Sequence, residues 1–571
     1  MQISGAELVV KALKEEKTDT LFAYPGGQAI DLFHALYGER NIRVITPRHE
    51  QGLVHAADGY ARSTGKTGVC LVTSGPGAAN LVTGIATANM DSVPLVCFTG
   101  QVPRNLIGKD SFQEVDTVSI MKTVCKYAVT VRDRKELGPA IKRAFEAAKN
   151  GKPGAAVIDL PKDIQQELGS DLYSASEKLQ PAADVCLEQI RRGTELLKTS
   201  RRPLFLAGGG VNIAHAGKEM TRLAEKTGIP VVTTIMGKGA LPTSHPLYAG
   251  NIGIHGSFAA NTAVSQCDLL FAVGTRFSDR VTGNTDEFAS QASVIHADIE
   301  PKIISRNIHA DVAIAADAGE VISALSETAE VLETEEWRRQ ITLWKQQHPL
   351  VLKTKYRDKM NARDVIEAIN QLFESAVITT DVGQNQLWTA QFLELTDKKQ
   401  MITSGGLGTM GYGFPAAIGA KLGNPDKDVV SVCGDGGFQM NIQELATAVA
   451  YELPVIVCIL NNGYLGNVRQ WQEMFYDRHY SGTCTRYRQS CPVICSAPRP
   501  DCPEYIPDFL RLAESYGAKG IRVQKSEDIR AALSEAKRTK KVPTVIEFMI
   551  GPEDNVLPIV PPGSPLNGMI E

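Results

Sequence analysis

The sequence has no long apolar run and no strong excess of charge of one sign. One long stretch without a charged side chain covers 401–420, and six glycines and one proline interrupt it. This composition predicts a ligand-lining loop and helix rather than a membrane span. The formal net charge is −4 over 571 residues, with acidic and basic residues mixed along the chain. We therefore expect no nucleic-acid partner and no membrane association.

The first residues also lack the features of a targeting segment. Residues 1–6 do not show the basic-then-apolar pattern of a secretion signal, and no Arg- and Ser-rich stretch precedes the first predicted strand. Eleven cysteines in such a chain favour reduced thiols in a cytosol. We expect a cytoplasmic protein.

The length and the pattern of apolar segments predict several α/β domains. The hydrophobic content of 43% and the charged content of 22% are those of a globular protein with sizeable cores. Short apolar runs alternate with helical patterns, as in doubly wound parallel sheets. Strands are predicted at 19–24, 68–73, 94–99, 155–160, 203–207, 230–234, 269–273, 294–297, 376–380, 429–433 and 454–460. The sequence predicts three doubly wound parallel-sheet α/β domains at 1–166, 190–327 and 363–550, followed by a C-terminal tail at 551–571.

Two connectors separate the three predicted domains. Residues 167–189 are polar, so we expect a loop there. Residues 327–362 are charged and helix-like, which predicts a linker helix.

Two short motifs in the third domain predict a metal and phosphate site. Gly434-Asp435-Gly436 follows one apolar strand and Asn461-Asn462 follows the next, with a helix predicted at 441–452 between them. Such a unit makes the strands parallel and adjacent, so Asp435 and Asn462 reach one edge of the sheet. Carboxylate and amide oxygens suit Mg²⁺, and the glycines let the backbone approach a diphosphate. Singly, each motif is more typical of a turn or a loop, but together they resemble the magnesium–diphosphate motif of thiamine diphosphate enzymes.

Such enzymes also need an acid beside the cofactor's pyrimidine ring, which shifts that ring to its imino form. Glu50 is the candidate, because it begins a predicted helix after a strand in the first domain. An acid at a helix start also satisfies free amide groups, and for Glu50 alone this alternative is favoured. Beside the magnesium motif, a catalytic role is favoured.

Further motifs resemble the catalytic large subunits of acetolactate synthase, also called acetohydroxyacid synthase, over nearly the whole chain. The matching segments are 24–27, 49–52, 73–77, 98–103, 112–114, 159–163, 405–413, 470–472 and 553–558. The resemblance implies a pyrimidine-binding domain, a middle FAD-type domain and a diphosphate-binding domain, in that order.

The resemblance implies a carboligating transferase. In that family the ylide of thiamine diphosphate attacks pyruvate, carbon dioxide leaves, and the remaining two-carbon unit attacks a second 2-oxoacid. Pyruvate as acceptor gives 2-acetolactate, and 2-oxobutyrate gives 2-aceto-2-hydroxybutyrate, which begin branched-chain amino-acid biosynthesis. The implied cofactors are thiamine diphosphate, Mg²⁺, and FAD in a non-redox role, with the protein positioning the cofactor and excluding water.

The resemblance also implies roles at the thiamine diphosphate. Glu50 activates the pyrimidine, and Asp435, Asn462 and the main-chain oxygen of Tyr464 bind Mg²⁺. Met410 props the cofactor into a bent shape, although a methionine in a Gly-rich loop also simply fills space. The other implied contacts are Gly26, Gly27, Gly383, Gln384, Asn385, Gly408, Gly434 and Gly436.

A second implied set lies at the pocket for the acceptor substrate. Trp471 offers an aromatic wall that favours 2-oxobutyrate through one more buried methyl group, worth about 1–3 kcal/mol. Arg280 suits the acceptor carboxylate, with an ion pair to Asp279 or Asp286 as the alternative. The set is completed by Phe112, Gln113, Lys162 and Phe475, residue types that are also common on surfaces and in cores.

The middle domain carries the implied FAD site. The segment 276–283 resembles text found in the biosynthetic enzymes of the family and absent from the fermentative ones, which lack FAD. The acidic side chains would meet ribose or adenine groups at strand ends. The implied contacts are Lys152, His255, Gly274, Arg276, Asp298 and Asp317.

Glu50 and the magnesium motif lie in separate domains, so we expect the cofactor between the Glu50 domain of one subunit and the Asp435 domain of another. A homodimer is then the smallest active unit and a homotetramer an alternative. The family also implies a small, valine-sensing regulatory subunit. Rival interpretations are a pyruvate oxidase or glyoxylate carboligase type of enzyme, and a non-catalytic homologue acting as a regulatory subunit. The glyoxylate carboligase type usually lacks the glutamate, and intact Glu50, Asp435 and Asn462 argue against a non-catalytic chain.

A cysteine cluster follows the acceptor-pocket residues, in what looks like an insertion in the segment that closes over the family's active site. It consists of Cys484, Cys491, Cys495 and Cys502. The spacing does not match a common zinc ribbon, yet four thiolates can hold zinc or an iron–sulfur cluster. We hypothesise that a metal or a reversible disulfide here links activity to redox state, with reduced, unliganded thiols as the favoured alternative.

Overall fold

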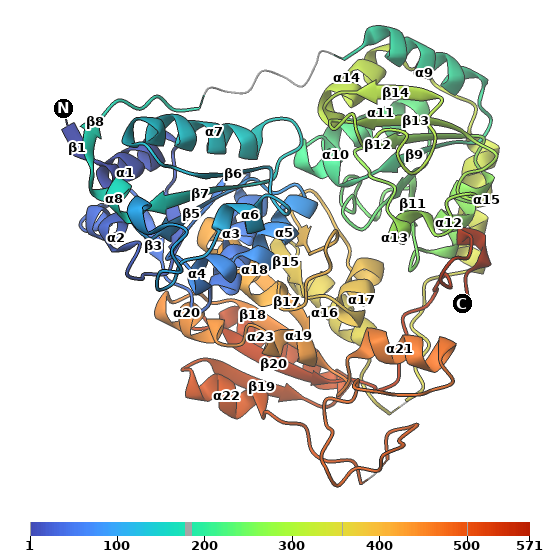
Figure 1. The fold of residues 1–571 in the computed structure, drawn as a ribbon. Helices are drawn as coiled ribbons and strands as arrows, with labels where there is room; N and C mark the ends of the chain where they lie inside the picture. The colour runs from blue at the N-terminus through green and yellow to red at the C-terminus, as the bar shows by residue number, and fades with distance from the viewer. Residues whose placement is uncertain (1, 177–184, 357, 500) are drawn as a thin grey trace.

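The protein is described by a computed structural model that covers residues 2–176, 185–356, 358–499 and 501–571. Three six-stranded sheets, each with all its strands parallel, follow one another along the chain (Figure 1). Figure 1 shows the first domain in blue, the middle domain in green and the third in yellow to red. The predicted fold class is confirmed, whereas the exact domain boundaries stay predictions.

The first sheet has the strand order β3–β2–β4–β5–β7–β6. Its strands are β2 (Thr20–Ala23), β3 (Arg43–Ile45), β4 (Gly68–Val72), β5 (Leu95–Gln101), β6 (Tyr127–Thr130) and β7 (Ala155–Pro161). Its helices are α1 (Gly5–Glu15), α2 (Ile30–Leu36), α3 (Glu50–Thr64), α4 (Pro76–Ala79), α5 (Val82–Met90), α6 (Thr117–Met121), α7 (Leu137–Lys149) and α8 (Lys162–Gln166). A separate antiparallel pair joins β1 (Gln2–Ser4) to β8 (Leu168–Ser170), which lies inside the predicted connector.

The middle sheet has the order β11–β10–β9–β12–β13–β14. Its strands are β9 (Pro203–Ala207), β10 (Val231–Thr233), β11 (Tyr248–Asn251), β12 (Leu269–Val273), β13 (Ser293–Asp298) and β14 (Val312–Ala315). Its helices are α9 (Leu187–Thr199), α10 (Gly209–Ile213), α11 (Gly217–Thr227), α12 (Phe258–Gln266), α13 (Asp279–Thr282), α14 (Ala318–Thr328) and α15 (Glu335–Gln347).

The third sheet has the order β16–β15–β17–β18–β20–β19. Its strands are β15 (Ala376–Thr380), β16 (Gln400–Ile402), β17 (Asp428–Gly434), β18 (Ile456–Asn461), β19 (Lys519–Val523) and β20 (Thr544–Met549). Its helices are α16 (Ala362–Leu372), α17 (Gln384–Phe392), α18 (Gly413–Gly423), α19 (Asp435–Gln439), α20 (Glu444–Ala450), α21 (Gly466–Phe475), α22 (Phe509–Ser515) and α23 (Ile529–Arg538). The helix predicted at 441–452 is therefore shorter at both ends.

The linker helix predicted at 327–362 is wrong in its extent. Among the described residues between the end of α14 and the start of α16, α15 alone is helical, because Pro349 cannot continue it and 349–355 have no helical structure. Trp337 and Trp344 of α15 are buried in the core of the middle domain. The indole of Trp337 donates a hydrogen bond to the carbonyl oxygen of Pro203 at 3.1 Å. The helix therefore covers the middle sheet rather than bridging two domains.

Each sheet is buried on both faces, since successive side chains of a strand point to opposite sides. In β4, Val69 and Leu71 join one core cluster, whereas Cys70 and Val72 join another. β9 of the middle sheet and β17 of the third alternate in the same way. Burial on both faces explains why these strands are continuous apolar runs in the sequence.

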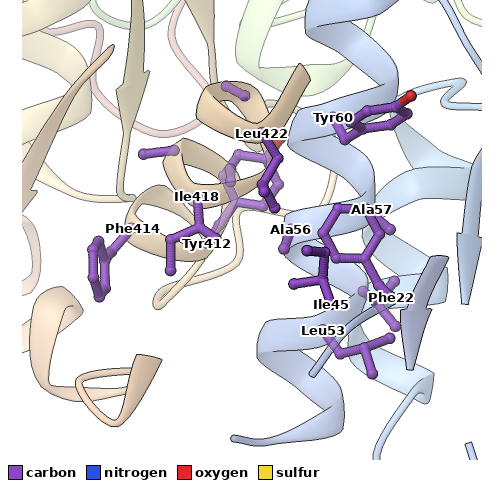
Figure 2. Close-up of a cluster of buried hydrophobic side chains, with 14 of the residues drawn as sticks. Phe22, Ile45, Leu53, Ala56, Ala57, Tyr60, Tyr412, Phe414, Ile418 and Leu422 are labelled. Atoms are coloured by element: carbon purple, nitrogen blue, oxygen red, sulfur yellow. The ribbon is translucent and has the colours of Figure 1, made fainter. Parts of the chain in front are cut away.

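Helices α3 and α18 join the first domain to the third. Their side chains belong to one core cluster, which includes Leu53, Ala56 and Ala57 of α3 and Ile418 and Leu422 of α18 (Figure 2). Two glycines bring the backbones together. A Cβ on Gly419 would lie 1.7 Å from the carbonyl oxygen of Ala56, and one on Gly59 would lie 2.1 Å from that of Ala416. The crossing leaves no room for a methyl group at either position.

Candidate active site

The structure brings the two predicted magnesium ligands together at the carboxyl edge of the third sheet. β17 and β18 are parallel neighbours, with Gly434 opposite Leu460. Asp435 is the first residue of α19, and the main-chain N–H of Asn462 is one of the groups that hydrogen-bond its carboxylate. Asp435 and Asn462 are both buried. The side-chain oxygen of Asn462 accepts a hydrogen bond from the main-chain N–H of Tyr464 at 3.0 Å.

Burial raises the pKa of Asp435 to about 6, against hydrogen bonds from Tyr505 and Thr485 that lower it. The Thr485 hydroxyl donates to Oδ2 of Asp435 at 3.0 Å. A buried carboxylate next to an amide oxygen is a donor set that suits a hard dication.

The predicted diphosphate contacts lie at the start of α17. Gly383 precedes the helix with φ +128°, and a Cβ there would meet no atom within 4 Å. The side-chain oxygen of Asn385 is buried without a hydrogen-bond partner. A Cβ on Gly434 would lie 3.3 Å from the Asn385 side-chain nitrogen. Open space beside the N–H groups of a helix start and an unpaired polar atom suit a phosphate group.

Gln384 ties this helix start to the magnesium ligands and to the C-terminal tail. Its side-chain oxygen accepts a hydrogen bond from Asn462 at 3.1 Å. Its amide nitrogen donates to Gln470 and to the carbonyl oxygen of Asp554, both at 3.0 Å. Gln470 in turn exchanges two hydrogen bonds with the backbone of Val556. The tail is therefore anchored beside the site.

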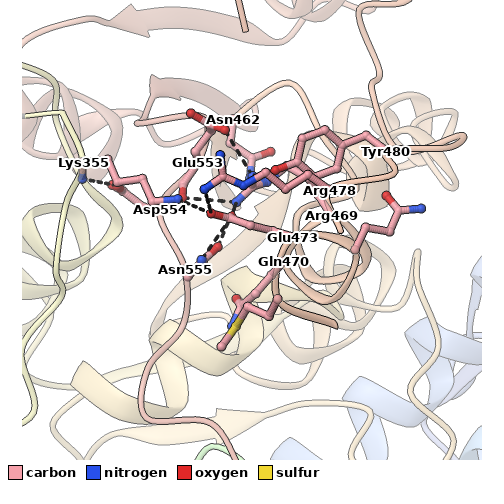
Figure 3. Close-up of polar contacts among 12 residues, drawn as sticks. Lys355, Asn462, Arg469, Gln470, Glu473, Arg478, Tyr480, Glu553, Asp554 and Asn555 are labelled. Atoms are coloured by element: carbon pink, nitrogen blue, oxygen red, sulfur yellow. Dashed lines mark hydrogen bonds and ion pairs between the residues drawn. The ribbon is translucent and has the colours of Figure 1, made fainter. Parts of the chain in front are cut away.

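Arg469 holds the same region together from inside α21 (Figure 3). Its guanidinium is 1% exposed and pairs with Glu473 at 3.0 Å and Glu553 at 3.5 Å. It also donates to Asn555 at 2.8 Å and lies 5.7 Å from the ring centre of Tyr464. Arg469 was not predicted: Glu473 at i+4 is typical of a surface helix pair, and nothing nearby in the chain marks Glu553 or Asn555 as partners.

Glu50 begins α3, but other side chains accept hydrogen bonds from the amides around that helix start. His49 accepts from the N–H of Gln51, and Glu444 accepts from the N–H groups of Arg48 and His49. The Glu50 carboxylate instead accepts a hydrogen bond from the Asn80 side chain at 2.9 Å. No hydrogen bond found in the described ranges joins Glu50 to the proposed metal ligands of its own chain.

Several predicted residues surround the loop at 73–77 near Glu50. A Cβ on Gly26 would lie 2.5 Å from Cβ of Thr73, and the Lys162 ammonium donates to the carbonyl oxygen of Gly27 at 3.0 Å. Gln113 has φ +59°, and its carbonyl oxygen would lie 2.7 Å from a Cβ on Gly75. Its neighbour Phe112 is 84% exposed in the single chain.

The remaining acceptor-pocket residues form a second group at α13 and α21. Trp471 and Phe475 meet edge to face with ring centres 6.0 Å apart, and the Arg280 guanidinium lies 5.8 Å from the Trp471 ring. Arg280 also pairs with Asp279 at 3.5 Å, but both side chains are largely exposed, so this pair contributes little to stability. No contact found among the described residues joins this group to Phe112, Gln113 and Lys162 within one chain.

All six predicted FAD contacts line one cavity of about 1740 Å³ between the three domains. They are Lys152, His255, Gly274, Arg276, Asp298 and Asp317. Gly383, Gly408, Arg280 and Trp471 line the same cavity, so it reaches the predicted thiamine diphosphate and acceptor sites. A Cβ on Gly274, which has φ +63°, would lie 2.6 Å from Cα of Gly210. At this point the cavity wall therefore consists of two backbone segments in close contact. Such glycine backbone is typical of dinucleotide sites.

Burial sets the charge of this cavity. It raises the pKa of Asp298 to about 6 and lowers that of His255 to about 4. Burial and the nearby Arg276 lower the pKa of Lys152. His255 is therefore neutral at pH 7, and the cavity offers both hydrogen-bonding and cationic side chains to an anionic dinucleotide.

Met410 and Gly436 lie together beside the magnesium ligands. A Cβ on Gly436 would lie 3.7 Å from the terminal methyl of Met410. Gly408 has φ +73°, and a Cβ there would lie 4.0 Å from Cγ1 of Val382, an ordinary contact. The Gly-rich loop therefore places a flexible apolar side chain beside Gly436, whereas its role in bending the cofactor stays a prediction.

The cysteine cluster does not form a metal centre in the part of the chain that the structure describes. All eleven cysteines are free thiols. Across 2–176, 185–356, 358–499 and 501–571, no three His, Cys, Asp or Glu side chains gather as a metal-binding group. The four clustered cysteines are half-buried in the loop between α21 and α22. No helix in these ranges has the length and apolar character needed to cross a bilayer.

Comparisons with known proteins agree with this geometry. Sequence models for the N-terminal TPP-binding, central and C-terminal TPP-binding domains of thiamine pyrophosphate enzymes match residues 3–120, 190–325 and 381–548. A probable acetolactate synthase large subunit of Methanocaldococcus jannaschii is 43% identical, covering 100% of this chain and 95% of that protein.

Two bacterial proteins named acetolactate synthase large subunit are similarly related. That of Parasynechococcus marenigrum is 43% identical over 98% of this chain and 90% of its own length. That of Corynebacterium glutamicum is 41% identical over 99% and 89%. With three matching domains and identity at this level along its whole length, the chain belongs to the acetolactate synthase large-subunit family of thiamine pyrophosphate enzymes.

Proposed function

We propose that this protein is the catalytic subunit of an acetolactate synthase, which decarboxylates pyruvate and joins the two-carbon unit to a second 2-oxoacid. The observation that carries the proposal is the meeting of Asp435 and Asn462 at neighbouring strand ends, beside the open helix start at Gly383. The family membership of the whole chain supports the same reaction.

Thiamine diphosphate, when bound, supplies the electron sink that makes decarboxylation of a 2-oxoacid feasible. Asp435, Asn462 and the main-chain oxygen of Tyr464 would hold Mg²⁺ on its diphosphate. Gly383, Gln384 and Asn385 would hold the diphosphate oxygens at the start of α17. Met410 would support the thiazolium side, because it lies next to Gly436.

Glu50 is proposed to exchange a proton with the pyrimidine ring nitrogen. Its carboxylate accepts a hydrogen bond from Asn80, while His49 caps the helix by accepting from the N–H of Gln51. An acid that shares a proton with the ring must be able to gain and lose that proton, which an amide cannot do.

Glu50 and Asp435 are proposed to meet across a homodimer. Within one chain their hydrogen-bond partners differ, since Asn80 serves Glu50 and Thr485 serves Asp435. A second copy would also cover Phe112, a large apolar side chain that is 84% exposed. A homotetramer would repeat the same interface.

The acceptor 2-oxoacid is proposed to bind between Arg280 and the aromatic pair Trp471 and Phe475. The guanidinium would bind the carboxylate, while the rings would bury the alkyl group of 2-oxobutyrate. Phe112, Gln113 and Lys162 of a second subunit would close the other side.

FAD is proposed to fill the large cavity without a redox role, as its contact with all three domains fits a structural cofactor. A small regulatory subunit is a further proposed partner, because the named relatives are large subunits. We propose a cytoplasmic location on the basis of the reduced cysteines.

Product analysis tests this function. The purified protein is supplied with pyruvate and 2-oxobutyrate, with thiamine diphosphate, Mg²⁺ or FAD omitted in turn. We expect carbon dioxide, 2-acetolactate and 2-aceto-2-hydroxybutyrate only when thiamine diphosphate and Mg²⁺ are both present. Acetyl products with bleaching of the flavin by pyruvate would indicate an oxidase, and no turnover in the complete mixture would indicate a non-catalytic homologue.

A further inference from the structure

The segment that carries the cysteine cluster begins by pairing with the backbone of the proposed magnesium site. The N–H of Leu465 donates to the carbonyl oxygen of Thr483 at 2.8 Å, and the N–H of Thr485 donates to that of Gly463 at 3.1 Å. Between these bonds, Tyr464 and Cys484 form an antiparallel bridge. Residues 483–485 therefore lie directly along the residues that follow Asn462.

This pairing delivers two hydroxyl groups to the Asp435 carboxylate. The Thr485 hydroxyl donates to Oδ2 at 3.0 Å. Tyr505, twenty residues later, also hydrogen-bonds the carboxylate. The Gln439 side chain donates to the Tyr505 oxygen at 2.7 Å, which directs the phenol proton toward Asp435. The segment thus supplies two hydroxyl groups to this carboxylate, one from Thr485 and one from Tyr505.

Arg486 packs beside Tyr464, whose main-chain oxygen is the third proposed magnesium ligand. Its guanidinium lies 5.7 Å from the centre of the Tyr464 ring. Its Nε would lie 2.8 Å from a Cβ on Gly463, which has φ +72°. The side chain therefore fills the space beside the turn that presents the main-chain oxygen of Tyr464.

The rest of the segment is built differently. Val493 and Ile494 at its middle are almost fully exposed, so they add little to a core. The contacts with the proposed magnesium site come from 483–486 and from Tyr505. A segment with contacts of this kind acts on the site more than on the fold.

We propose that Thr485 and Tyr505 are positioning residues that orient Asp435 for Mg²⁺. This inference rests on the proposed function. A carboxylate that accepts hydrogen bonds from fixed donors keeps one orientation, and removing such donors typically weakens metal binding 10–100-fold. The segment would therefore contribute to Mg²⁺ affinity through the orientation of Asp435.

The test measures Mg²⁺ affinity by calorimetric titration of the full-length protein in the presence of thiamine diphosphate. The variants are Thr485→Val, Thr485→Ser and Tyr505→Phe. The control is Tyr487→Phe, which removes a hydroxyl from the same segment at a side chain that is 59% exposed. Turnover of pyruvate is measured against Mg²⁺ concentration in parallel.

We expect Thr485→Val and Tyr505→Phe to bind Mg²⁺ about 10–100-fold more weakly, with kcat restored at saturating Mg²⁺. Thr485→Ser keeps the hydroxyl and should match the wild type, as should Tyr487→Phe. Tyr505→Phe changes no shape, so it stays informative if Thr485→Val fails to fold.

Two results would overturn the inference: folded Thr485→Val and Tyr505→Phe proteins with wild-type Mg²⁺ affinity, or a loss in Thr485→Ser as large as in Thr485→Val. A wild-type protein that binds neither Mg²⁺ nor thiamine diphosphate would instead refute the proposed function. The two failures are therefore distinguishable.

Discussion

Replacement of Gly419 by alanine tests the packing that joins the first and third domains. Gly419 lies where α18 crosses α3, and an added Cβ would sit 1.7 Å from the carbonyl oxygen of Ala56. Real Cβ atoms essentially never approach a heavy atom closer than 3.0 Å, so one helix must move by at least 3.0 − 1.7 = 1.3 Å. The obstructing atom belongs to helix backbone and cannot rotate away.

The expected magnitude follows from two opposing effects. Overpacking a core costs about 1–3 kcal/mol and more when backbone must shift, whereas alanine in place of glycine favours a helix by about 1 kcal/mol. The clash is with backbone, so overpacking dominates and we expect a net loss of about 2 kcal/mol. The same shift would strain the hydrogen bonds from Arg48 and His49, just before α3, to Glu444 of the third domain.

Gly193→Ala is the matched control. Gly193 is a buried helical glycine in α9, where an added Cβ would lie 3.4 Å from the nearest side-chain carbon of Ile295, an ordinary contact. That variant should gain about 0.5–1 kcal/mol. Urea unfolding followed by circular dichroism measures both variants, and a Gly419→Ala protein as stable as Gly193→Ala would refute the account of this crossing.

Three further predictions concern other parts of the molecule. Arg469→Met removes the buried guanidinium between Glu473 and Glu553 and should lower the unfolding free energy by about 3 kcal/mol; a urea-unfolding change below about 1 kcal/mol would contradict the role of this pair. Burial lowers the pKa of Lys238 from 10.5 to about 7. Between pH 7 and pH 10.5 the unfolded state therefore binds a proton that the folded state has lost. The free energy of unfolding consequently rises with pH over this range. The stability advantage of Lys238→Met over the wild type should therefore shrink from pH 7 towards pH 10.5, and an advantage independent of pH would contradict it. Gly274→Ala places a methyl group 2.6 Å from Cα of Gly210 and should lower the flavin retained on purification, measured by visible absorbance; full retention would exclude FAD from this cavity.

The central strands of each sheet were predictable because they are buried on both faces. β9, β12 and β15 begin and end where the apolar runs at 203–207, 269–273 and 376–380 do. The strands at the sheet edges that were not predicted, such as β14 and β19, are partly exposed and do not form continuous apolar runs. β20 is central but contains Glu547, whose buried carboxylate is served by Asn461 and Arg522. A charge inside the run concealed that strand.

Strand topology and family resemblance predicted some residues of the candidate site but not the contacts that loops make with them. Parallel neighbouring strands place Asp435 and Asn462 at one edge, whatever surrounds them. Thr485 meets Asp435 from 50 positions away, and Arg469 meets Glu553 from another segment altogether. Such contacts depend on how loops pack, which no periodicity in the sequence records.

A mixed-subunit experiment tests most directly that Glu50 of one subunit and Asp435 of another serve one cofactor. Glu50→Gln and Asp435→Asn chains are each expected to be inactive alone. Coexpressed in equal amounts, they should form mixed dimers in half of the assemblies, each with one intact site, and recover roughly a quarter of wild-type acetolactate formation. If the two residues act within a single chain, no site in any assembly is intact, and activity no higher than that of the separate variants would contradict the account.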